Sequence, residues 1–310
     1  MRTSVQTIAH LLVYVVIRVL VCIIQAMRIE TCEVLAGVLA WLANDVLRVR
    51  HGVVDENLRH AFPEMTGAGR RRVGRCMWRH LVLMACEIAH APRKIHRTNW
   101  HRYVTIDQRR ELLRFLFDAR PTALVSGHFG NFELGGFVTG LLGFPTFTVA
   151  RPLDNPYLDR FLNRFRGAHG QFILPKQGSA SQIQAILAAG HAITLLGDQC
   201  AGPKGCWVEF FGRPASCHKA IALFTLASGA PMLVVYAMRT RPLHFEVGLA
   251  GIADPEIPAP QFSGVPALTR WYNERLESAI RLAPEQYWWV HRRWKETRPV
   301  RRSAEKRHAA

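Results

Sequence analysis

One stretch of the chain constrains its fold more than any other: it runs from Thr122 to Gly136 and reads TALVSGHFGNFELGG. The stretch opens with a short apolar run that is typical of a buried strand. From Asn131 onward, apolar residues recur at the spacing of a helix. The pattern predicts a strand, a tight loop and a helix, with His128 in the loop and Glu133 in the first helical turn.

His128 and Glu133 are a candidate catalytic pair. Within one regular helix, five positions separate two side chains by roughly 140°. The two can therefore meet only if His128 precedes the helix, which Gly127 and Gly130 permit. A histidine oriented by a carboxylate is a general base, and a carboxylate in the first turn also suits the helix dipole. Spacing alone suits equally well a surface histidine and a capping glutamate that never touch.

The nucleophile for such a base is expected to come from the substrate. Positions 127 to 136 contain neither Ser nor Cys, so a substrate hydroxyl would give its proton to His128. A membrane-anchored hydrolase would instead need a protein nucleophile. The nearby candidate, Ser126, lies on the strand side and has no G-x-S-x-G turn around it. Transfer to a substrate hydroxyl is therefore favoured over hydrolysis.

An apolar segment over residues 8–27 is the second constraint, with Arg18 as its one charged residue. As a helix, it would be about 30 Å long, which matches the hydrocarbon core of a bilayer. Arg18 would cost roughly 2.5–3.5 kcal/mol near the centre. The many Leu, Ile and Val residues, at about −0.3 to −0.6 kcal/mol each, outweigh that cost. The segment is predicted to be an uncleaved anchor that crosses the membrane or lies along it, with a buried helix of a soluble domain as the alternative.

The charge of the chain indicates an anionic partner. Lys and Arg number 40 against 23 Asp and Glu, a formal net charge of +17. Nucleic acid, an acidic membrane face and an acidic protein all fit this balance. No helix-turn-helix, zinc-finger or aromatic RNA-binding pattern is present, so nucleic acid is not expected as a partner. Basic residues follow the anchor more densely than they precede it, which places the main body in the cytoplasm.

The seven cysteines do not predict a disulfide framework, because their number is odd and the chain is long. Cys200, Cys206 and the adjacent Cys217 and His218 would be the candidates for zinc. However, no C-x2-C pair is present. The sequence therefore predicts neither a metal site nor a cofactor.

The chain divides into four predicted parts. Residues 1–29 form the anchor, 30–104 a helical segment, 105–297 an α/β domain and 298–310 a basic tail. In the helical segment, Pro63 is expected to end one helix and Thr66 to cap the next.

From about residue 105, short apolar strands alternate with helices, which indicates a mostly parallel sheet with helices on both faces. Strands are expected from Thr146 to Ala150 and, as a short extended segment, from Val208 to Phe211, and a helix is expected after Pro156 through about Gly167. Near the end, the run from Pro284 to Trp294 interleaves aromatic and basic residues. It forms either an aromatic edge of the core or a belt at a membrane interface.

Six blocks together resemble the bacterial lipid A biosynthesis acyltransferases, the lauroyl/myristoyl late acyltransferases. That family is part of the wider lysophospholipid/glycerolipid acyltransferases with an H-x4-D/E motif. The central block here is GHFGNFE, and the others follow the family's order over nearly the whole chain. The matching blocks are Asn57 to Glu64, Gly127 to Glu133, Arg151 to Pro156, Gly197 to Gln199, Val208 to Pro214 and Pro284 to Trp294.

The resemblance implies a role for each residue of the centre. His128 would deprotonate a hydroxyl of a lipid acceptor, and Glu133 would orient His128. The hydroxyl would attack the thioester of an acyl donor, usually acyl carrier protein in this family, with acyl-CoA as the alternative. Arg166 stands where an arginine is expected to stabilise the oxyanion, and its neighbour Arg164 is the alternative. Neither a metal nor a covalent enzyme intermediate is needed.

Other residues are implied to bind substrate. Arg151 is expected to bind a lipid phosphate, and Asp198 to bind the acceptor or hold an arginine. Asn131 and Asp154 complete the expected substrate contacts. The family often has a second acidic residue after Asp198, which this chain lacks, and the acceptor's identity is therefore left open between a lipid A precursor, a hydroxyacyl-linked aminolipid and a lysophospholipid.

The resemblance also explains the positive charge. Acyl carrier proteins are acidic, lipid A precursors carry phosphates, and the inner leaflet is anionic. The expected location is the bacterial inner membrane, with the catalytic domain on its cytoplasmic face.

Overall fold

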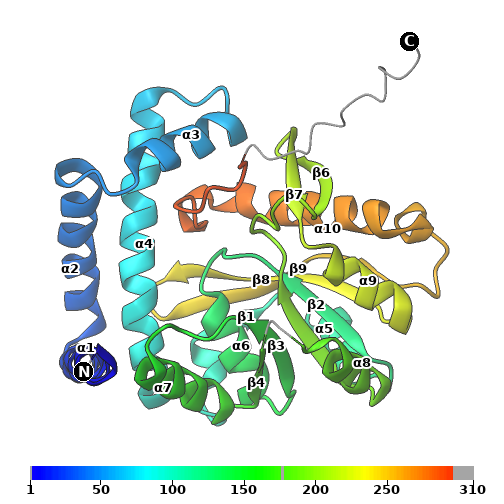
Figure 1. Ribbon diagram of the computed structural model, residues 1–310, viewed down its shortest axis with the longest axis horizontal. Coiled ribbons are helices and arrows are strands. Elements are labelled where there is room, and N and C mark those ends of the chain that lie inside the picture. The colour runs from blue at the N-terminus through cyan, green and yellow to red at the C-terminus, as the bar shows by residue number, and fades with distance from the viewer. Residues whose placement is uncertain (1, 176–177, 296–310) are drawn as a thin grey trace.

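The computed structural model describes residues 2–175 and 178–295 (Figure 1). The predicted basic tail, residues 298–310, lies outside the described residues. The predicted division of the chain into four parts stays a prediction.

A seven-stranded sheet forms the centre of the molecule, in the order β1-β9-β8-β2-β5-β3-β4. Its neighbouring strands are parallel except for β8 and β9, which form an antiparallel pair. This confirms the predicted mostly parallel sheet. The strands are β1 (Val104–Ile106), β2 (Thr122–Ser126), β3 (Thr146–Ala150), β4 (Gln171–Pro175), β5 (Ala192–Leu196), β8 (Met232–Arg241) and β9 (His244–Ala253).

Helices cover both faces of the sheet and so bury its strands on both sides. Side chains alternate along β2, so Ala123 and Val125 join the main core under three helices, while Leu124 joins the cluster of α5 on the opposite face. The helix α6 also packs on this second face, against β8, β3 and β4. The helices of the α/β part are α5 (Arg109–Leu116), α6 (Phe132–Leu141), α7 (Pro156–Gly167), α8 (Ala180–Ala188), α9 (Lys219–Ser228) and α10 (Val265–Leu282), of which α8, α9 and α10 cover the main core.

The helices that precede the sheet stand beside it, with α2 alongside the long helix α4 and α1 seen end-on (Figure 1). As the sequence predicts, α3 ends before Pro63, and the hydroxyl of Thr66 caps α4 by accepting from the N–H of Gly69 at 3.1 Å. A short π-helical stretch, η1, follows α2. These elements are α1 (Arg2–Ala26), α2 (Ile29–Trp41), η1 (Leu42–Val46), α3 (His51–Ala61) and α4 (Gly67–Lys94).

The predicted anchor is a continuous helix, and residues 5–26 of α1 are long and apolar enough to cross a membrane. Arg18 is held at its surface by Tyr14, whose hydroxyl is 3.2 Å from Nη1, and it lies over the ring of Phe161 in α7 at 4.8 Å. The side-chain amide of Asn155, just before α7, donates to the carbonyl of His10 at 2.8 Å. The helix therefore presents its arginine to α7 and a large apolar surface to its surroundings.

A second, two-stranded sheet was only half predicted. The sequence suggested one extended segment from Val208 to Phe211. The structure has an antiparallel hairpin of β6 (Cys206–Phe210) and β7 (Arg213–Cys217). Phe211 and Gly212 both have positive φ, at 51° and 69°, as a tight two-residue hairpin turn requires. Gly202, Pro203 and Gly205 precede the hairpin and are typical of a loop, so the sequence does not predict both of its strands.

Within the aromatic and basic run near the end, Trp289, Arg293 and Trp294 belong to the core. Trp289 and Trp294 are 1% and 9% exposed, and the Arg293 side chain is buried between β7 and α10. Its Nη1 donates to the carbonyl of Ser216 at 2.8 Å. The alternative of a membrane-interface belt is therefore wrong for these residues.

Candidate active site

His128 and Asp198 meet at the carboxyl edge of the sheet. The strands before them, β2 and β5, run parallel with Ser126 opposite Leu196, so both loops leave the sheet at the same level. Nδ1 of His128 is 2.8 Å from Oδ1 of Asp198, and the backbone N–H of His128 donates to Oδ2 at 2.9 Å. The side chain of Asp198 is 2% exposed. Because the ionised carboxylate accepts a hydrogen bond from Nδ1–H, the proton of the neutral ring is on Nδ1 and Nε2 is the acceptor.

The charges of the two groups stabilise each other. Burial opposes the protonated imidazole, but the charge of Asp198 and its hydrogen bond, with a smaller effect from Glu133, raise the pKa of His128 above its ordinary value. Burial would raise the pKa of Asp198 too. The imidazolium, the two hydrogen bonds from His128 and the charge of Arg293 instead lower the pKa of Asp198 to about 2. The carboxylate is therefore ionised at every pH at which the histidine titrates.

Glu133 does not contact His128, which corrects the expected pairing. Its carboxylate accepts two hydrogen bonds from Arg166, with Nε 3.0 Å from Oε2 and Nη2 bonded to Oε1. Both side chains are largely buried, at 13% and 15% exposed. Glu133 lies in the first turn of α6 and Arg166 in the last turn of α7, as predicted. The glutamate thus fixes the arginine, and Asp198 holds the histidine.

Three side chains surround the ring of His128. The amide Nε2 of Gln199 is 3.2 Å from Nε2 of the histidine, where an acceptor hydroxyl would also have to approach. The rings of Phe132 and Trp288 lie edge-on to the imidazole at 5.0 Å and 5.8 Å. The backbone N–H of Trp288 donates to the carbonyl of His128 at 3.0 Å. The C-terminal segment therefore forms one wall of the centre.

The loop after His128 is fixed by close backbone packing. Gly130 has φ +61°, and a Cβ there would lie 2.1 Å from the carbonyl oxygen of Ala237, so only glycine fits. Its N–H donates to the carbonyl of Gln286 at 3.0 Å, and its carbonyl lies 3.2 Å from Nε2 of His80. The loop is therefore held from β8, α4 and the C-terminal segment together.

Asn131 belongs to this support and not to a substrate contact, which corrects the sequence interpretation. It is fully buried; its Oδ1 caps α6 by accepting from Leu134 at 3.2 Å, and its Nδ2 donates to Glu87 at 3.0 Å. Glu87 in turn forms a buried ion pair with Arg239, with Nε 2.6 Å from Oε1. Both polar ends of the asparagine are thus used by the protein.

The remaining predicted residues lie near α7 and remain exposed. Arg151 and Asp154, in the loop after β3, form an ion pair at 2.5 Å with side chains 75% and 87% exposed. Arg164 is exposed on α7, and its side chain has no hydrogen bond or ion pair with any residue that the structure describes. The structure brings none of these three to His128.

A narrow cavity of about 120 Å³ lies between α6 and the sheet, next to the centre. Phe132, Glu133 and Arg166 line it, and Ser126 and Ala150 lie at the carboxyl ends of its strands. Its other walls are mostly aliphatic side chains of β2, β5, β8 and β9, with Leu112 and Leu116 of α5.

The end of the cavity next to the amino-terminal ends of β3 and β4 is polar. Thr146 lies four residues from Ala150, about 13 Å along the strand. The buried hydroxyls of Thr146 and Thr148 have no hydrogen-bond partner within the described part of the chain. In the neighbouring strands, Gln171 of β4 lies opposite Thr146, and Thr194 of β5 lies opposite Thr148.

The sequence profile of one family, described as bacterial lipid A biosynthesis acyltransferase, matches residues 2–296. The chain belongs to that family. This acyltransferase is 29% identical over 264 residues to a lipid A biosynthesis lauroyltransferase of Escherichia coli, covering 83% of each chain. It is also 29% identical over 273 residues to the lipid A biosynthesis palmitoleoyltransferase of the same species, covering 85% of this chain and 84% of the relative.

Among solved structures, the 1-acyl-sn-glycerophosphate acyltransferase of Thermotoga maritima aligns with a TM-score of 0.40 and 11% identity. The alignment covers 87% of this acyltransferase and 100% of that chain.

The sequence carried a signal for the contact between His128 and Asp198 that was not used. In this acyltransferase, each follows a glycine directly after a buried strand, as Gly127-His128 and Gly197-Asp198. Ligands of open parallel sheets gather at the carboxyl ends of neighbouring strands. A Cβ at Gly127 would lie 3.3 Å from Cγ of Asp198, so the first glycine makes room for the carboxylate. No local pattern pointed to Gln199 or Trp288 as neighbours of the ring.

Proposed function

We propose that this acyltransferase moves a fatty acyl chain from an acyl thioester to a hydroxyl group of a lipid A precursor. One observation carries the proposal: Nδ1 of His128 is held by a buried, ionised Asp198, so Nε2 is the basic nitrogen of the ring. Nε2 lies 3.2 Å from the amide of Gln199, which the acceptor hydroxyl would replace, and the ring lies against Phe132 of the cavity wall. Membership of the lipid A biosynthesis acyltransferase family supports the acceptor class, as do the names of the two Escherichia coli relatives.

The reaction needs no protein nucleophile. Nε2 of His128 takes the proton of the acceptor hydroxyl, whose oxygen attacks the carbonyl carbon of the thioester. The tetrahedral intermediate then breaks its carbon–sulfur bond. The thiol leaves with the proton from the imidazolium, and an ester remains on the acceptor. Asp198 fixes the tautomer and stabilises the imidazolium between the two proton transfers.

Arg166 is our candidate for stabilising the oxyanion. Glu133 occupies its Nε and Nη2, and no described residue accepts a hydrogen bond from Nη1. A guanidinium that is already held in place costs little reorganisation when charge develops on the carbonyl oxygen. In this proposal Glu133 acts on catalysis by positioning Arg166, and by adding a smaller negative charge near His128.

The cavity of α6 is proposed to take the donor's acyl chain. Its mouth lies by Phe132, whose ring contacts His128, and its middle is mostly apolar. The unpartnered hydroxyls of Thr146 and Thr148 mark its far end. Methylene groups pressed against these hydroxyls would leave them unsatisfied, so the chain is expected to stop above them.

The surroundings of the reaction follow from α1 and from the charge. The helix α1 is proposed to hold the enzyme at the bacterial inner membrane, with the catalytic part on the cytoplasmic face. A net charge of +17 would then lie beside anionic lipid. It also suits acyl carrier protein, which is acidic, as the donor, with acyl-CoA as the alternative.

A mass-resolved acyl-transfer assay tests the proposal. The full-length enzyme in detergent would receive acyl carrier protein or CoA loaded with chains of several lengths. The acceptors would be acyl-deficient lipid A precursors, lysophospholipids and hydroxyacyl aminolipids. We expect one acylated lipid A product, and a loss of about 10²–10⁴ in rate in His128→Ala. The matched control is His101→Ala, which removes an exposed histidine of the short helix after α4.

Two results would contradict the proposal. Acylation of a lysophospholipid or an aminolipid alone would replace the acceptor and keep the chemistry. Free fatty acid without an acylated lipid, still dependent on His128, would instead indicate a hydrolase.

A further inference from the structure

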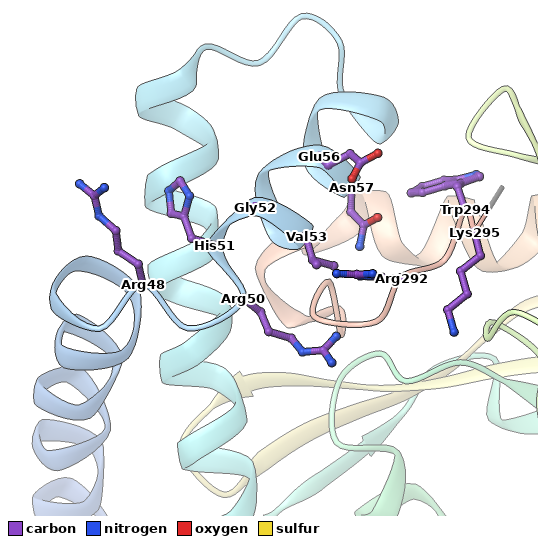
Figure 2. A pocket seen from close by; sticks show the side chains of 10 residues that line it. All are labelled: Arg48, Arg50, His51, Gly52, Val53, Glu56, Asn57, Arg292, Trp294 and Lys295. Carbon is purple, nitrogen blue, oxygen red and sulfur yellow. The ribbon is translucent and has the colours of Figure 1, made fainter.

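A basic groove of about 980 Å³ opens between the corner of η1 and α3 and the C-terminal segment (Figure 2). Two segments far apart in the sequence form its walls. Arg48 and Arg50 come from the corner, and Arg292 and Lys295 come from the chain end. Its one acidic residue is Glu56, which is exposed and lies 3.7 Å from His60. The groove therefore carries a clear excess of positive charge.

Most of these cations lack a partner. The side chains of Arg48, Arg292 and Lys295 are exposed and form no ion pair or hydrogen bond with the residues that the structure describes. Three arginines of the neighbouring helix α4 behave differently, because they pair with carboxylates at 2.5–2.7 Å: Arg70 with Asp55, Arg75 with Asp45 and Arg79 with Glu33. Clustered cations without counter-charges repel each other, and an anion in the groove would relieve that repulsion.

The backbone at Arg48 and Arg50, in the corner between η1 and α3, is conformationally strained. Arg48 and Arg50 both have left-handed backbone conformations, with φ of 48° and 52°. Glycine or asparagine would adopt this conformation with less strain. Strained residues that the surroundings hold in place concentrate at binding sites. Nη1 of Arg50 donates to the carbonyl of Val290 at 2.9 Å and so ties the corner to the opposite wall.

The groove is connected to the reaction centre through a short piece of chain. Nδ2 of Asn57, in the groove wall, donates to the carbonyls of Trp289 and His291 at 2.7 Å each. Trp288, the residue before Trp289, has its ring centroid 5.8 Å from that of His128. Arg292 is four positions after Trp288, so their Cα atoms lie at most about 14 Å apart. The same short segment therefore lines both the groove and the site of His128.

We propose that this groove binds a phosphate group of the acceptor lipid while the acceptor's hydroxyl lies at His128. The inference rests on the proposed function and adds the place at which the acceptor is held. Arginine favours phosphate because its planar guanidinium donates two parallel hydrogen bonds to the anion. The exposed guanidiniums of Arg48 and Arg292 keep all their donors available for it.

The double variant Arg48→Gln/Arg292→Gln tests the groove without touching Arg50 or Asn57, which hold the walls together. The matched control is Arg109→Gln/Arg110→Gln, which removes the same charge from exposed positions on α5. Acyl transfer would be measured with a phosphorylated lipid A precursor and with the same lipid after enzymatic removal of its phosphates. We expect KM for the phosphorylated acceptor to rise about tenfold or more, with kcat little changed. KM for the dephosphorylated lipid should already be high in the wild type and should not rise further.

A binding arm separates this inference from the proposed function. Immobilised His128→Ala protein, with and without the groove substitutions, would bind both forms of the acceptor in the absence of turnover. Loss of the preference for phosphate in the groove variant supports the site even if no acceptor is ever acylated. Equal binding of the two lipid forms by the parent protein overturns the site, even if acyl transfer proceeds.

Vesicles distinguish the acceptor's phosphate from that of the bulk membrane. Sedimentation with phosphatidylglycerol and with phosphatidylcholine vesicles would be compared for the same proteins. We expect the groove variant to bind anionic vesicles as well as the Arg109→Gln/Arg110→Gln control does. A selective loss of anionic vesicle binding, with acceptor KM unchanged, would assign the groove to the membrane and overturn the inference.

Discussion

The reaction centre and the basic groove use charge in opposite ways. At the centre, His128, Asp198, Glu133 and Arg166 are all largely buried, and each has an oppositely charged or hydrogen-bonded partner. In the groove, Arg48, Arg292 and Lys295 are exposed and unpaired within the described residues. Buried ion pairs fix the positions and the pKa values of their side chains, because charges interact strongly away from water and separating them costs much free energy. Exposed cations do not fix the positions of neighbouring side chains. They remain available to bind an anion, and salt screens their charge.

The largest effect is expected from Asp198→Asn, which breaks the buried pair with little change in shape. The asparagine cannot hold Nδ1–H with a charge, so kcat should fall by about 10²–10⁴. The negative charge of Asp198 raises the pKa of His128, and activity requires the neutral ring, so wild-type activity should fall as pH drops through that raised pKa. In the variant, the acid limb of the pH–rate profile should move to lower pH. An unchanged limb would contradict the role given to Asp198.

Glu133→Gln should have the next largest effect, because it loosens Arg166 without unpairing His128. We expect kcat to fall by about 10–10² through poorer stabilisation of the oxyanion. The acid limb should move to lower pH by less than in Asp198→Asn, since Glu133 adds only a smaller charge effect on the histidine. The two profiles, recorded side by side, decide which carboxylate orients His128. A larger shift in Glu133→Gln would restore the pairing expected from the sequence.

Salt should produce the smallest effect and should separate the two regions. Raising the ionic strength from about 0.05 M to 0.5 M shortens the screening length severalfold. KM for a phosphorylated acceptor should therefore rise several-fold in the wild type and much less in Arg48→Gln/Arg292→Gln. The acid limb of kcat should stay in place, because the charges that set it are buried. A limb that moves with salt would show that the centre is more open to solvent than its burial indicates.

The sequence predicted those parts of the fold that depend on local pattern. The helix of α1, the end of α3 before Pro63, the cap at Thr66 and the strand β3 all follow from runs of neighbouring residues. His128 and Glu133 also lie where the pattern placed them, with His128 before α6 and Glu133 in its first turn.

The pairing of charges could not be predicted in the same way. His128 has an aspartate 70 positions away as its partner, and Glu133 has an arginine 33 positions away. Those contacts depend on the order of strands in the sheet and on the approach of α7 to α6. The groove depends on longer-range packing still, since its two walls meet only because α3 packs against the chain end.

The contact between α1 and α7 has a consequence for how this enzyme can be handled. Tyr14 and Arg18 lie against Tyr157 and Phe161, on the same helix whose last turn carries Arg166. A truncation that starts after residue 27, made to obtain a water-soluble enzyme, would strip these rings of their cover. The apolar helix α1 thus also supports α7, and removing it would loosen the arginine on which we propose that catalysis depends.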